Sequence, residues 1–173
     1  MDKVPVTVDG FKRMEDEVKK LKTIERPTVI KAIAEAKEHG DLKENAEYHA
    51  AREKQSFIEG RILELEDKIA RADSIDPRLL SGDTVKFGAV VKLVDENTEE
   101  EISYHIVGEY EADIKRNLVA ITAPISRALI GKSVGDSVEV HAPSGIRHYE
   151  ILEVHFQPIT AQVTAQTTAQ ITA

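Results

Sequence analysis

Two apolar stripes within the first 72 residues constrain the fold of this chain more than any other feature. Members of each stripe recur at intervals of three and four residues, the spacing of one buried face of a helix. They are Phe11, Met14, Val18, Leu21, Ile30, Ile33 and Ala34 in the first stripe, and Ile58, Ile62, Leu65, Ile69 and Ala72 in the second. Charged residues of both signs flank the stripes, and Pro27 interrupts the first. The pattern predicts two helices packed along a narrow seam, with a kink or a fresh helical start at Pro27.

The break between the stripes lies at His39-Gly40-Asp41. Gly40 suits the left-handed residue that ends a helix. Asp41 suits the N-cap of the next helix, with Glu44 three residues on, as in a capping box. So short a turn makes the two helices antiparallel neighbours. We therefore expect an antiparallel coiled-coil hairpin at residues 1–75, whose first helix would extend about 45 Å.

Beyond residue 82 apolar and polar residues alternate, as in strands. The expected strands are 84–93, 101–107, 118–122, 137–141 and 149–156. With a short helix at 126–130 they predict a small antiparallel sheet domain over 83–157, and the chain falls in the α+β class. Pro77 and Gly82 mark 76–82 as the linker. Residues 158–173 repeat Thr-Ala-Gln units without charge, so we expect a disordered low-complexity tail.

Composition excludes several function classes. A net charge of −8 over 173 residues argues against free-standing binding to nucleic acid. The chain has no cysteine, which excludes thiol catalysis, disulfides and cysteine-based zinc sites. No apolar run approaches the roughly 20 residues that span a bilayer, and no signal peptide is read, so we expect a cytoplasmic protein without a membrane partner. The basic residues Lys12, Arg13, Lys19 and Lys20 predict a solvated face or a contact with RNA or an acidic protein surface.

Asp41 and Glu44 are the residues best suited to metal chemistry. Within one helical turn their Cβ atoms would lie about 5–6 Å apart. They could share a Mg²⁺ ion, which takes few protein carboxylates and can complete a two-metal site that activates water against a phosphodiester. Two ligands bind metal weakly, so a partner would have to supply the rest. The alternative is that both acids only cap a helix.

Two other patterns are rejected. Residues 126–133 end like a phosphate-binding loop, but Ser126 stands where its first glycine belongs. The histidines form no metal-binding pair on a predicted helix, and no Ser-His-Asp order has motif support.

The tip segment 34–53, A-E-A-K-E-H-G-D-L-K-E-N-A-E-Y-H-A-A-R-E, closely resembles the hairpin tip of the bacterial Gre transcript cleavage factors. The resemblance covers about residues 4–156 and continues through 58–62, 83–88, 106–108, 111–113 and 126–132. It implies an N-terminal antiparallel coiled coil and a C-terminal FKBP-like domain.

The resemblance also implies a function. Such a factor is not itself an enzyme: it binds RNA polymerase at the secondary channel and stimulates the polymerase's own Mg²⁺-dependent cleavage near the 3′ end of backtracked RNA. Asp41 and Glu44 would hold Mg²⁺ only when the polymerase active centre completes the site. The implied supporting residues are Asn45, Tyr48 and Arg52, and the implied contacts with the channel rim are Pro124, Ile125 and Ser126. A monomer is expected.

Three alternatives stay open at this stage. The first is an inhibitor, in which the same hairpin enters the same channel but blocks the polymerase. The intact acid pair argues against this. An FKBP-like domain would suggest a peptidyl-prolyl isomerase, although residues 81–157 hold few aromatic side chains for a proline pocket. A plain coiled-coil interaction module without chemistry is the third.

Overall fold

A computed structural model describes residues 2–159, which form two compact units. One unit is Phe11–Ala72, and the other joins residues 2–10 to the described residues from 73 onward. Residues 2–10 therefore group with the sheet and not with the hairpin predicted for 1–75. Among the described residues, no helix combines the length and apolar character needed to cross a bilayer.

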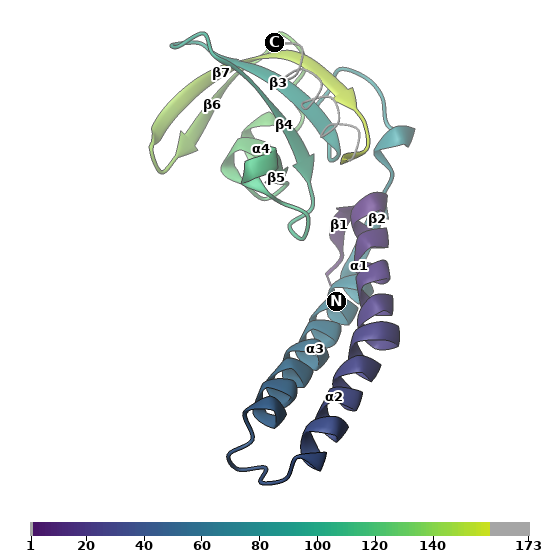
Figure 1. Cartoon of the computed structure of the whole chain (residues 1–173). Helices are drawn as coiled ribbons and strands as arrows, with labels where there is room; N and C mark the ends of the chain where they lie inside the picture. Colours follow the sequence, from purple (N-terminus) through teal and green to yellow (C-terminus); the bar gives the residue numbers. More distant parts are fainter. Residues whose placement is uncertain (1, 160–173) are drawn as a thin grey trace, which may run out of the picture. The chain divides into compact units, whose positions relative to one another are not determined.

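The hairpin unit is built from consecutive helical segments that run out and one long helix that returns (Figure 1). The segments are α1 (Val8–Lys20), the π-helical turn η1 (Leu21–Glu25), α2 (Arg26–Glu38) and the returning α3 (Ala46–Arg71). Six of the twelve predicted stripe residues are buried at the seam: Met14, Leu21 and Ile33 on the outgoing side, and Ile58, Ile62 and Leu65 on α3. Val29 and Ala36, which were not predicted, are buried with them, whereas the predicted Ile30 and Ala34 are exposed. The two predicted helices and their seam are confirmed.

The π-helical turn explains how the chain passes Pro27. The N–H of Arg26 donates to the carbonyl of Leu21, five residues back, which widens the helix there. Pro27 then falls in the first turn of α2, where its missing N–H costs little. The interruption predicted at Pro27 is thus a local widening of the helix.

Ion pairs bridge the two sides of the hairpin. Arg26 makes two hydrogen bonds to Glu59, from Nε to Oε1 at 2.7 Å and from Nη2 to Oε2 at 2.9 Å. Arg61 pairs with Glu17 in the same two-pronged way at 2.7 and 3.1 Å. Hydrogen bonding from Arg26 lowers the pKa of Glu59. Paired charges therefore flank the narrow apolar seam on its exposed sides.

The sheet unit contains a five-stranded sheet in the order β5-β4-β3-β7-β6. Its strands are β3 (Ala89–Asp95), β4 (Glu101–Val107), β5 (Leu118–Ala120), β6 (Ser137–Ala142) and β7 (Gly145–Phe156). The predicted antiparallel sheet is confirmed, with one addition: β4 and β5, at one edge, are parallel, while all the other pairs are antiparallel. The connection through 108–117 brings the chain back to start β5 in the same direction as β4.

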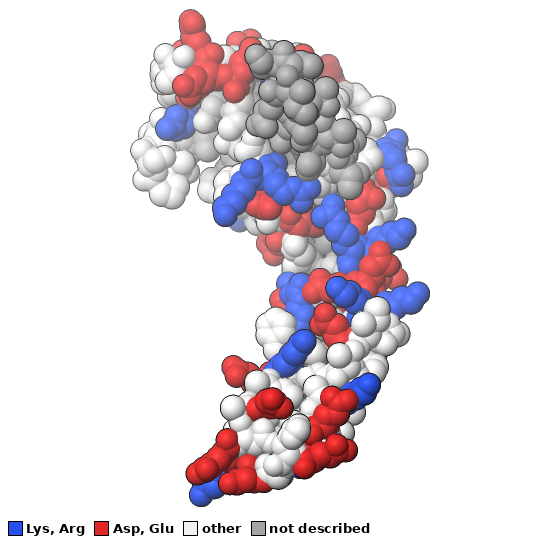
Figure 2. Space-filling view, in the orientation of Figure 1, with Lys and Arg blue, Asp and Glu red and all other residues white. Residues whose placement is uncertain are grey.

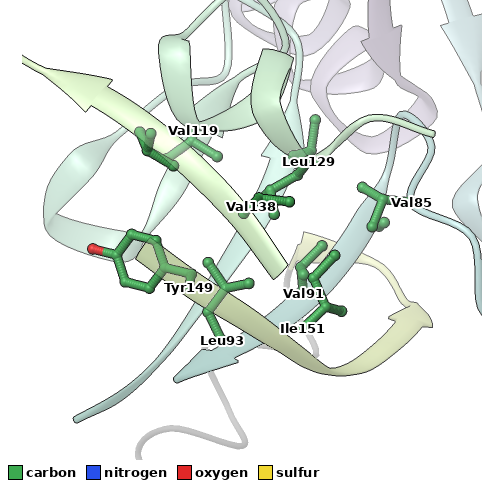
Figure 3. Packing of buried hydrophobic residues seen from close by; sticks show 11 residues of the cluster. Val85, Val91, Leu93, Val119, Leu129, Val138, Tyr149 and Ile151 are labelled. Carbon is green, nitrogen blue, oxygen red and sulfur yellow. The ribbon is translucent and has the colours of Figure 1, made fainter. Parts of the chain in front are cut away.

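The helix α4 (Pro124–Leu129) packs on the sheet and closes its core. Figure 3 shows Leu129 of α4 beside Val138, with Val91 and Ile151 from the central strands. Strand β4 has the predicted bounds, whereas β3 begins at Ala89 and not at residue 84. Gly88 takes a left-handed φ of 87° immediately before β3, which starts the strand there.

A second sheet of two strands was not predicted. It joins β1 (Val4–Thr7) to β2 (Ala72–Ile75), and β2 continues into the 3₁₀ turn η2 (Pro77–Leu79) in the predicted linker. Val6 and Thr7 are fully buried. The carboxylate of Glu111 accepts hydrogen bonds from the N–H of Thr7 at 3.0 Å and of Gly108 at 2.9 Å. These contacts explain why the N-terminus belongs to the sheet unit.

The predicted tail lies mostly outside the described residues. Its first part is an exception, because Ile159 is only 1% exposed and packs with Val107 and Leu118. The predicted start of the tail at Pro158 is therefore too early.

Candidate functional site

The tip of the hairpin differs from the prediction in where the second helix begins. Asn45, not Asp41, is the N-cap of α3, and its Oδ1 accepts a hydrogen bond from the N–H of Tyr48 at 3.0 Å. Asn ranks with Asp among the preferred N-caps. The predicted capping box at Asp41 and Glu44 is therefore wrong, and both acids precede the helix.

Asp41 and Glu44 occupy the two ends of one β-turn. The carbonyl of Asp41 accepts a hydrogen bond from the N–H of Glu44 at 3.2 Å, which places their Cα atoms within about 7 Å of each other. Gly40 and Asp41 have consecutive positive φ angles of 73° and 40°. Asp tolerates this left-handed conformation better than most residues. We call residues 41–44 the acidic turn.

Asn45 fastens the acidic turn to the end of α2. Its Nδ2 donates to the carbonyl of Ala36 at 2.7 Å and reaches the carbonyl of Gly40 at 3.4 Å. One side chain thus caps α3 and also holds the last turn of α2. This gives the predicted supporting residue Asn45 a definite structural role.

A histidine that sequence reasoning missed holds the other side of the turn. The Nε2 atom of His49 lies 3.0 Å from the carbonyl oxygen of Lys43. The ring of Tyr48 packs edge-on against that of His49, with centroids 5.6 Å apart at 62°. No sequence pattern points to this contact, because His49 lies in a helix and its acceptor is a backbone carbonyl.

The charge at the tip is mainly acidic. Figure 2 shows Asp and Glu side chains gathered at the turn end of the hairpin. The side chains of Asp41 and Glu44 are exposed, and Arg52 is exposed on α3. Exposed carboxylates are the oxygen ligands that Mg²⁺ prefers. No group of three or more metal-binding side chains occurs in the described part of the chain.

The predicted docking residues have different surroundings. Pro124 and Ile125 line a pocket of about 280 Å³ in the sheet unit, together with Tyr104, Val140 and Tyr149. Ser126, in contrast, is fully buried, and its hydroxyl donates to the carbonyl of Ala120 at 2.6 Å. Ser126 therefore anchors the start of α4 and has no surface to offer a partner.

The predicted basic residues lie on the first helix. Lys12, Arg13, Lys19 and Lys20 are all exposed on α1, and the last two fall in its final turn. Glu15 and Asp16 are exposed between them. The face is consequently mixed in charge and not a continuous basic surface.

Comparison with known proteins places both halves of the chain in one family. Residues 4–73 match the family model described as "Transcription elongation factor, N-terminal". Residues 80–156 match the model described as "Transcription elongation factor, GreA/GreB, C-term".

Curated relatives match over nearly their whole length. The transcription elongation factor GreA of Phenylobacterium zucineum is 60% identical over 156 residues, which cover 90% of this chain and 99% of the relative. GreA of Cereibacter sphaeroides is 62% identical with the same coverage. Among solved structures, the GreA factor homolog Gfh1 of Thermus thermophilus is 27% identical, with a TM-score of 0.40, and the match covers 88% of this chain and 99% of that one. From the two family models and the two GreA relatives, we conclude that the chain belongs to the GreA/GreB family of transcription elongation factors.

Proposed function

We propose that this elongation factor binds RNA polymerase at its secondary channel and stimulates the polymerase's cleavage of backtracked RNA with the acidic turn. The observation that carries the proposal is the placement of Asp41 and Glu44 at the two ends of one exposed turn. Within the described part of the chain, neither carboxylate makes a hydrogen bond or an ion pair with another side chain. Both carboxylates are therefore available to ligands outside this chain.

The hairpin supplies reach. Its returning helix α3 has 26 residues, which at about 1.5 Å per residue span about 39 Å. A narrow pair of helices braced by ion pairs can enter a channel that a globular domain cannot. The chemical groups sit where such a rod would first meet the 3′ end of the RNA.

The acidic turn brings two oxygen ligands and two negative charges to the polymerase active centre. A Mg²⁺ ion held there by these carboxylates and by the polymerase would lower the pKa of a bound water and supply a nucleophile for the phosphodiester. Asn45 fixes the turn against α2 and α3. The chain would thus lend ligands to a site that the polymerase completes. We propose Tyr48 and Arg52 as neighbouring supports of the acidic turn.

The sheet unit would dock on the channel rim through Pro124 and Ile125, whose pocket can accept an apolar side chain. Lys12, Arg13, Lys19 and Lys20 would contact RNA or an acidic polymerase surface. The factor would act as a monomer.

The test uses a backtracked elongation complex with 3′-labelled RNA and Mg²⁺. Wild type should release short 3′ fragments. Asp41→Asn and Glu44→Gln should slow release at least about 100-fold, the effect of losing several kcal/mol of charge stabilisation. Glu53→Gln is the matched control, because Glu53 is an exposed acid on α3 outside the turn, and it should cleave like wild type.

Two outcomes would contradict the proposal. Full activity of Asp41→Asn would show that the Asp41 carboxylate takes no part in RNA cleavage. Slowed elongation without any cleavage by wild type would favour an inhibitor that blocks the channel.

A further inference from the structure

We infer that His49 is a positioning residue for the acidic turn, acting on Glu44 through the Lys43 carbonyl; this inference rests on the proposed function. His49 Nε2 lies 3.0 Å from that carbonyl oxygen, a normal hydrogen-bond distance. A carbonyl can only accept, so the ring must donate from Nε2.

The contact matters because of which peptide group it holds. The N–H of Glu44 donates to the carbonyl of Asp41, and the carbonyl of Lys43 accepts from His49. The Lys43–Glu44 peptide unit is therefore hydrogen-bonded at both ends. Since this planar unit leads directly into the Cα of Glu44, fixing it fixes the direction in which the Glu44 side chain leaves the backbone.

The ring itself is held by a rigid element. His49 lies in the first turn of α3, and its N–H donates to the carbonyl of Asn45 at 3.1 Å. Tyr48 packs against the ring edge, which limits its rotation. His49 thus transmits the rigidity of α3 to the exposed turn.

The two sides of the turn are held by different residues. Asn45 reaches back to Gly40 and Ala36 before the acidic turn, and His49 holds the peptide unit at its end. A catalytic carboxylate must be held close to its productive geometry, so loosening one side of the turn should slow chemistry without weakening binding elsewhere.

Three variants test the inference in the cleavage assay, each titrated to saturation. His49→Phe keeps an aromatic ring beside Tyr48 but cannot donate, and should lower the maximal cleavage rate about three- to tenfold, the range for one hydrogen bond. The factor concentration giving half-maximal rate should not change. His49→Gln carries an amide donor and should recover most of the rate. His39→Phe removes the other tip histidine and should behave like wild type.

A measurement on the free factor needs no polymerase. The ring ¹⁵N shifts of His49 should show hydrogen on Nε2, and the Glu44 amide should exchange faster in His49→Phe than in wild type. A ring carrying its only hydrogen on Nδ1 would overturn the inference. So would an unchanged maximal rate for His49→Phe, or a loss that appears only as weaker binding. Failure of the proposed function is distinguishable, because Asp41→Asn would then remain active.

Discussion

Glu111 accepts a hydrogen bond from the backbone N–H of Thr7, which lies 104 positions earlier in the chain. The same carboxylate oxygen, Oε2, accepts from the N–H of Gly108, and Oε1 accepts from the Thr7 hydroxyl. One side chain thus ties the N-terminal strand to the turn that follows β4. Within the sheet unit, it holds the segment from which α1 begins.

Loss of this carboxylate should destabilise the sheet unit. Glu111→Ala leaves two part-buried backbone N–H groups without acceptors and should lower the free energy of unfolding by about 2–3 kcal/mol. Glu111→Gln should cost less, because its amide oxygen can still accept from both donors. Urea denaturation of the full chain measures both. Equal effects of the two variants would contradict the hydrogen-bonding explanation.

Two glycines give a matched pair of predictions. A Cβ at position 108 would lie 2.3 Å from the carbonyl oxygen of Pro5, so Gly108→Ala must displace backbone and should destabilise by about 1–3 kcal/mol. A Cβ at position 60 meets nothing within 4 Å, so Gly60→Ala in the exposed middle of α3 should stabilise by up to about 1 kcal/mol. Thermal unfolding of the two variants should move in opposite directions.

Acid should weaken the hairpin through Glu59. Its pKa is lowered in the folded state, chiefly by the hydrogen bonds from Arg26. The unfolded chain therefore takes up the proton at a higher pH than the folded chain. The stabilisation is present above the ordinary glutamate pKa of about 4.3 and is lost as pH falls through the lower folded value. Urea unfolding followed by helical circular dichroism should show a smaller loss between pH 7 and pH 3 in Glu59→Gln than in wild type.

Variants at Asn45 and Asp41 should distinguish residues that cap a helix from residues that act only in RNA cleavage. Asn45→Ala removes the N-cap of α3 and should cost about 1 kcal/mol. Asn45→Asp retains the capping oxygen but loses the donor to Ala36, so it should cost less. Asp41→Asn should leave the unfolding midpoint unchanged, because Asp41 caps no helix. A lower unfolding midpoint in Asp41→Asn would indicate instead that Asp41 caps a helix, as its sequence context predicts.

The sequence predicted the elements whose signal is repeated along many residues. The stripes at Leu21 and Ile33 and at Ile58 and Leu65 define the hairpin seam because each position adds to one periodicity. The alternation in 101–107 likewise defined β4 to the residue. The candidate acidic pair at Asp41 and Glu44 is predictable from residue type and spacing alone.

Features that depend on a single contact were not predictable. Asp41 and Asn45 are both good N-caps, and only the reach of Asn45 to Ala36 and Tyr48 decides between them. Strand β1 has only four residues, and it is held by the Glu111 carboxylate, which accepts from the N–H groups of both Thr7 and Gly108, a contact that no local pattern records. The family resemblance implies a rim contact at Ser126, but this side chain is buried and its hydroxyl donates to the carbonyl of Ala120.

The acidic turn stands outside every helix and outside the seam, so the fold of the rod does not depend on Asp41 or Glu44. Alleles that alter either residue would yield a well-folded protein that still competes for the polymerase. Their genetic behaviour should therefore be dominant in a cell that also carries the normal gene. An allele that unfolds the rod would leave the polymerase free and should be recessive.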